Sequence, residues 1–221
     1  MRFVKTDSPA PVADYLAKRV AALLGENKRV LLLLSGGSAI AVAALAAKQL
    51  QGARLAGLAI TLTDERYGEP GHADSNWQQL LDAGFTLPGA VLVPVLQGKD
   101  IADTAASFDS ALETAFKHAD YSIGLFGIGP DGHTAGILPL TYAAAAPGMA
   151  YSYDGGKYQR VTMTPGAIAR LDEAVVYAMG REKWPVLEQL QNEVPVDRQP
   201  AQLLKQVRRV TVYNDHQGDK Q

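Results

Sequence analysis

The chain has 221 residues, 47% of them hydrophobic, so it can bury a substantial core, and a single α/β domain is the economical prediction. The formal net charge of −2 and the pI near 6.1 offer no basic field for nucleic acid, so any anion must be held by a local site. The absence of cysteine excludes disulfides, thiolate nucleophiles and cysteine-based zinc sites, and without a signal-peptide segment or a membrane-spanning apolar run we expect a soluble, cytoplasmic protein with no membrane partner.

The first part of the chain alternates predicted strands and helices. Residues 2–6 are expected to form an edge strand, and the Ser8-Pro9 pair starts a helix that Gly25 ends. Residues 30–34, VLLLL, are apolar on both faces, which is typical of a central parallel strand. A small-residue turn at residues 35–38 follows and leads into an alanine-rich helix.

That turn, Ser35-Gly36-Gly37-Ser38, has the chemistry of a phosphate-binding loop. Backbone N–H groups can crowd around a phosphate there, the helix dipole favours its charge, and Ser35 and Ser38 can add hydroxyl donors. The dipole contributes only about 0.3–2 kcal/mol, so a cationic side chain should also be needed. Gly36 and Gly37 are equally compatible with a turn that merely packs the helix on the sheet, with Ser38 as an ordinary N-cap.

The next predicted strand, residues 58–63, ends in the charged triplet Asp64-Glu65-Arg66. Such clusters are often no more than a solvated rim. Neighbouring parallel strands, however, deliver Ser35, Arg66 and His133 to the same edge of the sheet, so Arg66 is expected to face a ligand. A guanidinium suits a phosphate, a carboxylate or the oxyanion that forms when an ester carbonyl is attacked.

The middle of the chain predicts a helix over residues 76–83, a strand over 91–95 and a longer helix over 100–118. Three histidines in other parts of the chain are expected to be structural: His72, His118 and His216. No spacing of histidines and carboxylates suggests a metal site.

Residues 121–139, YSIGLFGIGPDGHTAGILP, carry the most informative pattern. An apolar run over 123–128 indicates a buried strand, and two glycines, an acid and an imidazole follow it: Gly129, Asp131, Gly132 and His133. Because ligands bind beyond the carboxyl ends of strands in open α/β sheets, this loop is a predicted functional site. It is also ordinary turn chemistry, in which a histidine caps a helix or bonds a carbonyl.

The rest of the chain predicts a hairpin of strands over 149–153 and 159–164, a strand over 174–179, a helix opening at Gly180, a short helix over 201–206 and a strand over 209–213. Lys183, near the start of a helix, is best explained if an anion lies nearby, although a solvated lysine fits equally well. A disordered polar tail is expected from about residue 215.

Residues 127–135, GIGPDGHTA, resemble the G-x-G-x-D-G-H-T-A motif of the 6-phosphogluconolactonases, in the superfamily shared with the glucosamine-6-phosphate isomerases. The turn at 35–38 is similar to the S-G-G-S-T-P sugar-phosphate loop of that superfamily, with Ala39-Ile40 in place of Thr-Pro. The triplet at 64–66, with Ser75-Asn76 beyond it, resembles the lactonase pattern D-E-R…S-N, where the isomerases carry D-E-Y.

Two further matches fall on residues that belong to the substrate pocket in the lactonases. Arg160 opens RVTMT, which resembles an R-x-T-x-T strand, and Lys183 matches a G-x-x-K lysine. The chain departs from the family at residues 136–138, where Gly-Ile-Leu replaces the usual Ser-Leu-Phe, so a serine hydroxyl and an aromatic ring are lost.

The resemblance implies a three-layer α/β sandwich around a mostly parallel sheet, and hydrolysis of 6-phosphogluconolactone to 6-phosphogluconate without a metal or cofactor. In this hypothesis His133 is the general base, Asp131 orients the imidazole or caps the following helix, and Arg66 or the N–H groups of the loop hold the oxyanion. The predicted substrate-binding residues are Ser35, Gly36, Gly37, Ser38, Asp64, Gly129, Gly132, Arg160 and Lys183. A phosphosugar lactone is the expected partner, and a monomer is favoured. The alternatives are a glucosamine-6-phosphate deaminase-isomerase and a non-catalytic sugar-phosphate sensor.

Overall fold

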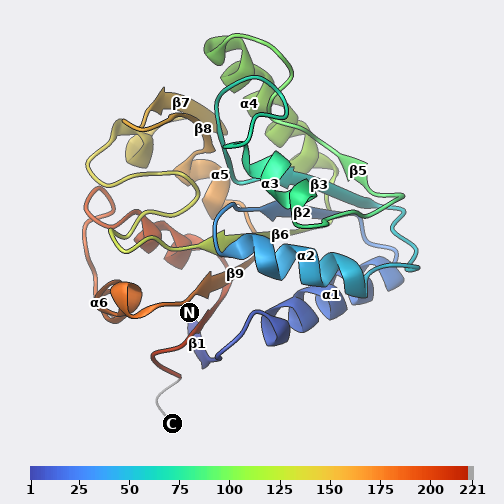
Figure 1. Ribbon diagram of the computed structural model, residues 1–221, viewed down its shortest axis with the longest axis horizontal. Coiled ribbons are helices and arrows are strands. Elements are labelled where there is room, and N and C mark those ends of the chain that lie inside the picture. Colours follow the sequence, from blue (N-terminus) through green and yellow to red (C-terminus); the bar gives the residue numbers. More distant parts are fainter. Residues whose placement is uncertain (219–221) are drawn as a thin grey trace.

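Residues 1–218 of the chain are described by a computed structural model, which contains two β-sheets (Figure 1). The larger sheet contains β1 (Arg2–Lys5), β2 (Val30–Leu34), β3 (Leu58–Leu62), β5 (Val91–Leu92), β6 (Tyr121–Gly127), β9 (Glu173–Ala178) and β10 (Arg209–Asn214). The smaller sheet contains β4 (Asp64–Arg66), β7 (Ala150–Asp154) and β8 (Gln159–Met163).

The α-helices are α1 (Ala10–Gly25), α2 (Ala39–Gln49), α3 (Asn76–Asp82), α4 (Ile101–His118), α5 (Pro165–Ala169) and α6 (Trp184–Gln189). Three short 3-10 helices, η1 (Tyr142–Ala145), η2 (Arg181–Lys183) and η3 (Pro200–Gln206), lie in the second half of the chain. Within residues 1–218, no helix combines the length and the apolar character that crossing a membrane requires.

The strands of the larger sheet are all parallel, in the order β1-β10-β9-β6-β2-β3-β5. From β2 the chain moves to β3 on one side and later returns to β6 on the other. The order therefore reverses between the carboxyl ends of β2 and β6, which is where an α/β sheet of this kind leaves a crevice for a ligand.

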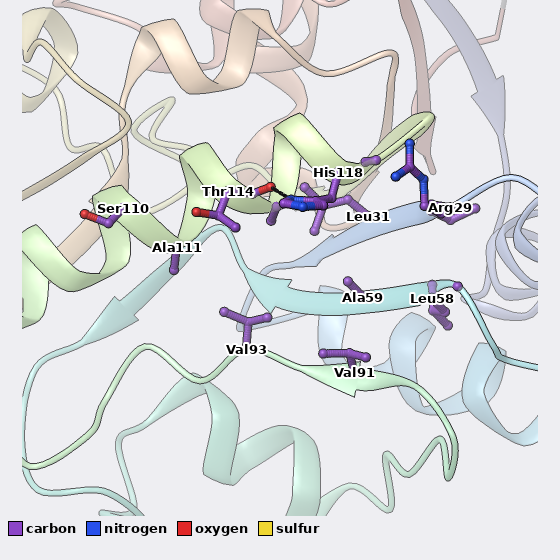
Figure 2. A pocket seen from close by; sticks show the side chains of 14 residues that line it. Arg29, Leu31, Leu58, Ala59, Val91, Val93, Ser110, Ala111, Thr114 and His118 are labelled. Carbon is purple, nitrogen blue, oxygen red and sulfur yellow. Dashed lines mark hydrogen bonds between the residues drawn. The ribbon is translucent and has the colours of Figure 1, made fainter.

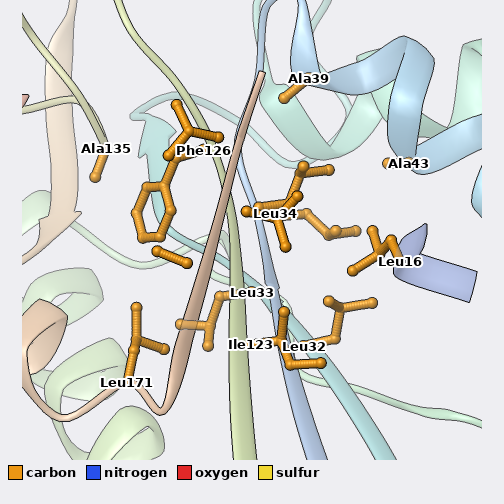
Figure 3. Packing of buried hydrophobic residues seen from close by; sticks show 14 of the residues in the cluster. Leu16, Leu32, Leu33, Leu34, Ala39, Ala43, Ile123, Phe126, Ala135 and Leu171 are labelled. Carbon is orange, nitrogen blue, oxygen red and sulfur yellow. The ribbon is translucent and has the colours of Figure 1, made fainter. Parts of the chain in front are cut away.

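The core explains why β2 is apolar on both faces. Helices α1 and α2 lie on one side of the larger sheet, whereas α4, α5 and the smaller sheet lie on the other (Figure 1). Every residue of β2 is consequently buried. Leu34 faces Leu16 of α1 on one side of the sheet, and Leu33 lies on the other side with Phe126 of β6 (Figure 3). The expected sandwich with helices on both faces is confirmed, and each fully buried leucine contributes roughly 1.5–3 kcal/mol to the stability of the fold.

The smaller sheet differs from the expectation for residues 64–66. These residues do not simply end a parallel strand, because β4 is a separate strand paired antiparallel with β8, so that Arg66 lies opposite Arg160. Thr63 makes the transition, since its N–H donates to the Leu34 carbonyl of the larger sheet and its own carbonyl accepts from the Met163 N–H of the smaller sheet. The predicted hairpin is present as β7 and β8.

Proline explains three further differences from the predicted elements. The helix expected to open at Gly180 is instead η2 followed by α6, because Pro185 has no N–H to donate to the carbonyl four residues earlier. The short helix expected at 201–206 is the 3-10 helix that Pro200 begins. Strand β5 has only two residues, since Pro94 cannot donate to a sheet ladder.

The residues after β10 also differ from the expected disordered tail. Asp215 accepts hydrogen bonds from the Gly180 N–H (3.1 Å) and the Trp184 Nε1–H (3.0 Å). His216 stacks on Trp184 with ring centroids 4.5 Å apart and contacts Glu188 through Nε2 (2.8 Å). This segment is therefore held against α6, and only residues 219–221 of the predicted tail lie outside the described residues.

Candidate active site

A polar cavity of about 290 Å³ lies at the carboxyl ends of β2 and β6, where the strand order reverses. Its wall is formed by the turn that follows β2, by the loop that follows β6, and by η2. Strands β4 and β8 of the smaller sheet complete it. All of the predicted site residues except Asp131 and Gly132 line it. Segments distant in sequence thus meet at one edge, as the strand pattern predicts.

The imidazole of His133 lies at this cavity with one nitrogen engaged. Its Nδ1 is 2.6 Å from Asp131 Oδ1, and the same oxygen accepts the His133 backbone N–H at 3.1 Å. The His133 side chain keeps 36% of its surface exposed. No helix follows the motif, because Thr134 and Ile137 form a β-bridge, so the alternative in which Asp131 or His133 caps a helix is wrong.

The Asp131 contact determines which nitrogen of His133 carries the proton. An ionised carboxylate only accepts hydrogen bonds, so Nδ1 is the donor and the neutral ring keeps a lone pair on Nε2. Burial raises the pKa of Asp131, but the charge of His133 and its hydrogen bonds outweigh burial and leave this pKa below its ordinary value. The pair therefore presents Nε2 as a base.

Gly129 explains how the ring fits against the loop. A Cβ atom at this position would lie 2.1 Å from His133 Nδ1 and 2.6 Å from Asp131 Oδ1, well inside contact distance. Gly129 thus leaves room for both members of the pair. Gly132, expected to bind substrate, instead packs on Gln199, and its carbonyl accepts from the Ala201 N–H (2.9 Å). It therefore supports the loop from outside the cavity.

The turn after β2 offers unused donors at the start of α2. Within the described residues, the backbone N–H groups of Gly36, Gly37 and Ser38 donate to no acceptor. Ser38 makes no side-chain hydrogen bond that caps α2, so its hydroxyl is also uncommitted. These groups surround the helix N-terminus, where an anion is favoured. Neither Ala39 nor Ile40, which replace the family's Thr-Pro, lines the cavity.

Ser35 differs from the expectation that it donates to a phosphate. Its Oγ lies 2.6 Å from Thr63 Oγ1, which in turn donates to Asp64 Oδ1 at 3.0 Å. Since the single hydroxyl proton of Thr63 points to the carboxylate, Ser35 must donate to Thr63. The donors left for an anion are therefore Ser38 and the backbone of the turn.

Lys183 brings a cation to the same cavity from η2. No described residue accepts a hydrogen bond from its ammonium or forms an ion pair with it. Burial lowers the pKa of Lys183, while the charges of Glu182 and Asp215 raise it and oppose that effect. A partly buried ammonium without a direct partner suits an anionic ligand.

The opposite wall carries an acid and two arginines. Asp64 Oδ2 lies 3.7 Å from Arg160 Nη1, and Arg66 Nη1 donates to the Asp74 carbonyl at 3.1 Å. Three buried polar atoms in this wall have no hydrogen-bond partner: Arg66 Nε, Arg160 Nε and Asn76 Oδ1. Native structures leave few such atoms unpaired, so their gathering at one cavity is a mark of a functional site.

Asn76 is a lining residue that sequence reasoning did not select. Its side-chain N–H donates to the Asp64 carbonyl at 2.9 Å, and a Cβ on Gly36 would lie 1.9 Å from its Oδ1. Asn76 thus joins α3 to both the acid and the turn. The D-E-R…S-N pattern contains this residue, but spacing alone does not reveal that it reaches the cavity.

Gly136 replaces the family's serine at a crowded position. Its φ of +70° is one that residues with side chains rarely adopt, and a Cβ there would lie 2.5 Å from Asp64 Oδ2. The departure therefore brings the backbone against the acid of the cavity wall. A serine at this position would have to displace either the backbone of the loop or the side chain of Asp64.

A larger cavity, of about 510 Å³, lies at the amino ends of β2 and β3 and is chemically different (Figure 2). It is bounded by α4 and by apolar side chains such as Ala59, Val91 and Val93. His118 is exposed, as expected, at the rim of this cavity, and it contacts the Thr114 carbonyl through Nδ1 (2.8 Å). None of the predicted site residues lies there, so the smaller cavity is the candidate active site.

A sheet of parallel strands, a turn with free N–H groups at a helix N-terminus and an imidazole–carboxylate pair at the same edge are features of α/β proteins whose ligands carry phosphate groups. Sequence comparison identifies the family: residues 5–213 match the model of "Glucosamine-6-phosphate isomerases/6-phosphogluconolactonase". The chain belongs to this family.

Relatives and a solved structure agree with this assignment. A 6-phosphogluconolactonase from Neisseria meningitidis serogroup A is 31% identical over 197 residues, covering 80% of this chain and 81% of the relative. The 6-phosphogluconolactonase of Homo sapiens is 26% identical over 211 residues, covering 89% of this chain and 82% of that protein. The crystal structure of a 6-phosphogluconolactonase from Shewanella baltica, 22% identical, superposes with a TM-score of 0.80 over 97% of each chain, which shows that the fold is shared.

Proposed function

We propose that the protein hydrolyses 6-phosphogluconolactone to 6-phosphogluconate, the second step of the pentose phosphate pathway. The observation that carries the proposal is that the His133–Asp131 pair and the anion-binding turn open on one cavity. Relatives at 31% identity named 6-phosphogluconolactonase support this reaction for the chain. Because the family also contains isomerases, the site chemistry must decide between the two reactions.

The phosphate of the substrate is proposed to lie on the turn formed by residues 36–38. The free N–H groups of the turn, the Ser38 hydroxyl and the N-terminus of α2 supply hydrogen bonds and a favourable dipole. Lys183 rather than Arg160 supplies the cation, because Arg160 already faces Asp64 whereas Lys183 has no anionic partner within the described residues. This placement directs the lactone ring toward His133.

His133 is proposed to act as the general base. Its neutral Nε2 takes a proton from a water molecule as the water oxygen attacks the lactone carbonyl, and the imidazolium returns that proton to the ring oxygen as the ester bond breaks. Asp131 holds Nδ1–H and stabilises the charged ring. Arg66 faces the oxyanion that forms on the carbonyl, where a fixed cation lowers the barrier.

The test compares the wild-type protein with His133→Ala on freshly prepared lactone, and it follows 6-phosphogluconate formation above the spontaneous rate. We expect kcat to fall by about 10²- to 10⁴-fold, the usual contribution of a general base. His118→Ala is the matched control, because His118 is exposed and lies at the other cavity, by the amino ends of β2 and β3. Equal rates for the wild type and His133→Ala would reject the mechanism.

Two other outcomes separate the alternative functions. Ammonia release from glucosamine 6-phosphate would establish a deaminase-isomerase. Thermal protection by 6-phosphogluconate without any turnover would establish a non-catalytic sensor. We also propose a single-domain, monomeric, cytoplasmic protein, and the contribution of both sheets to one cavity supports the single domain.

A further inference from the structure

The two arginines of the cavity wall face each other in an unfavourable arrangement. Arg66 of β4 and Arg160 of β8 are directly paired across the antiparallel ladder, and like charges at such positions repel. Both side chains nevertheless line the cavity. Asp64 lies near only one of them, at 3.7 Å from Arg160 Nη1. A further group is needed to keep both guanidiniums in place.

Tyr158, at the end of the turn that joins β7 to β8, provides that group. Its ring centroid lies 5.2 Å from Arg66 Cζ and 5.9 Å from Arg160 Cζ. Both distances are within the range over which the negative face of an aromatic ring attracts a cation. The ring therefore attracts both arginines, along with Lys157, whose Nζ lies 4.8 Å from the same centroid, although Tyr158 does not itself line the cavity.

The hydroxyl of Tyr158 connects the ring to the β4–α3 segment. It donates to Asp74 Oδ1 at 2.9 Å, and the carbonyl of the same Asp74 accepts from Arg66 Nη1 at 3.1 Å. The contact links segments 84 positions apart in the chain. Tyr158, Asp74 and Arg66 thus form a closed set of contacts that limits the rotamers open to Arg66.

The burial of the guanidiniums and the shape of the turn agree with this role. Arg66 Nε and Arg160 Nε are inaccessible to solvent and have no acceptor. A Cβ on Gly155, in the same turn, would lie 2.9 Å from Arg160 Nε, so the turn lies tightly against that side chain. The β7–β8 turn therefore holds Arg160 through Gly155 and both arginines through Tyr158.

We infer that Tyr158 is a positioning residue, which holds Arg66 and Arg160 side by side so that together they meet the negative charge developing on the substrate carbonyl. The inference rests on the proposed function for the identity of that charge. It adds to the proposed mechanism a residue outside the cavity that acts through the two arginines. Its effect should fall on kcat more than on KM, because substrate phosphate is held elsewhere, by the turn at 36–38 and Lys183.

The kinetic test compares Tyr158→Leu, Tyr158→Phe and the control Tyr142→Leu. We expect kcat to fall about tenfold in Tyr158→Leu with KM nearly unchanged, since the two cation–π contacts with the arginines are lost together with that of Lys157, which does not line the cavity. Tyr158→Phe keeps the ring and should restore most of this loss. Tyr142→Leu should match the wild type, because Tyr142 is exposed and contacts only Tyr151 among the aromatic rings of the described residues. A kcat for Tyr158→Leu equal to that of the wild type would overturn the inference.

A second measurement does not depend on activity. NMR spectra of Arg66→Lys and Arg160→Lys assign the Nε–H signals of the two arginines. These signals should be protected from solvent exchange in the wild type and in Tyr158→Phe, and they should be lost in Tyr158→Leu. Gly155→Ala should reduce the protection of the Arg160 signal and leave that of Arg66 unchanged. This variant replaces Tyr158→Leu in the test if Tyr158→Leu fails to fold. Signals that persist in Tyr158→Leu, or that are absent from the wild type, would overturn the inference.

The two measurements also separate this inference from the proposed function. If the wild type does not hydrolyse the lactone but the Nε–H signals respond as described, the positioning role stands and the reaction assignment fails. If the wild type is active and His133→Ala is not, but Tyr158→Leu retains both kcat and the Nε–H signals, the reaction stands and the positioning role fails.

Discussion

At the scale of single residues, the site depends on how each polar group is already committed within the chain. Asp131 uses one oxygen to hold both the ring and the backbone of His133. Ser35, although it lines the cavity, donates its proton to Thr63 and is not free for substrate. Fewer hydrogen-bonding groups are therefore free to contact a substrate than the residue types alone suggest.

Asp131→Asn tests whether the hydrogen bond from His133 Nδ1 to Asp131 matters for the reaction. An amide can donate to Nδ1 and so favour the tautomer that carries its proton on Nε2, and it removes the charge that stabilises imidazolium. We expect kcat to fall by about 10²-fold, near the lower end of the general-base contribution, with little change in KM. Steady-state rates on fresh lactone measure this change. Asp82→Asn, an exposed acid bonded to Gln78, is the control, and a KM effect larger than the kcat effect would contradict the assigned role.

At the scale of elements, the carboxyl-terminal segment packs on η2 and α6 and contributes to the pKa of Lys183. Asp215 holds Gly180 and Trp184 on either side of η2, and its charge raises the pKa of Lys183 against the lowering effect of burial. This coupling was not predictable from the sequence, because a short polar tail carries no periodic pattern that indicates packing. The contact is visible only once β10 is placed beside β9.

Asp215→Asn should therefore change how ligand binding depends on pH. Lys183 holds phosphate only while protonated, so 6-phosphogluconate binding should weaken as the pH rises through the lowered pKa of this lysine. Without the Asp215 charge that pKa falls further, and the alkaline loss of binding should begin at a lower pH. Calorimetric titration across the alkaline range measures the midpoint.

Lys183→Arg is the matched control for that titration. A guanidinium stays charged throughout the alkaline range, so binding should persist to higher pH than in the wild type. A midpoint that is the same in the wild type, Asp215→Asn and Lys183→Arg would show that Lys183 is not the group that titrates.

At the scale of the whole molecule, the larger sheet and the meeting of its loops follow from the sequence. The apolar run at residues 30–34 and the glycine-rich loop around His133 indicate strand ends that a parallel sheet brings together, and the structure places them at one cavity. Of the smaller sheet, the hairpin of β7 and β8 follows from the sequence but β4 does not, because a charged three-residue strand at 64–66 has no alternation to reveal it. The roles of Tyr158 and Asn76 depend on cross-strand register and packing, which no local pattern encodes.

A buried carboxylate at the amino ends of the strands, on the side of the sheet away from the cavity edge, contributes to the stability of the fold. Glu173, fully buried at the start of β9, accepts hydrogen bonds from Tyr15 of α1, from Arg19 Nε (3.1 Å) and from the Tyr121 hydroxyl (3.0 Å). It thereby joins α1 to the amino ends of β6 and β9. Burial, with the hydrogen bond to Glu173 and its charge, raises the pKa of Tyr15 to about 12.

This shift predicts how stability changes at high pH. The folded pKa of Tyr15 lies above the unfolded value near 10, so its contribution is fully present below pH 10 and is lost as the pH rises toward 12. Allowing for the partial exposure of Tyr15, we expect Tyr15→Phe to lower the free energy of unfolding by about 1 kcal/mol at pH 8.

The difference from the wild type should shrink above pH 10, because the wild type then loses the same contribution. Urea unfolding at pH 8, 9.5 and 10.5 measures it, with Tyr142→Phe, at an exposed ring, as the control. A difference between Tyr15→Phe and the wild type that stays constant up to pH 10.5 would mean that the pKa of Tyr15 is the same in the folded and unfolded chain, and that Glu173 does not hold α1 through it.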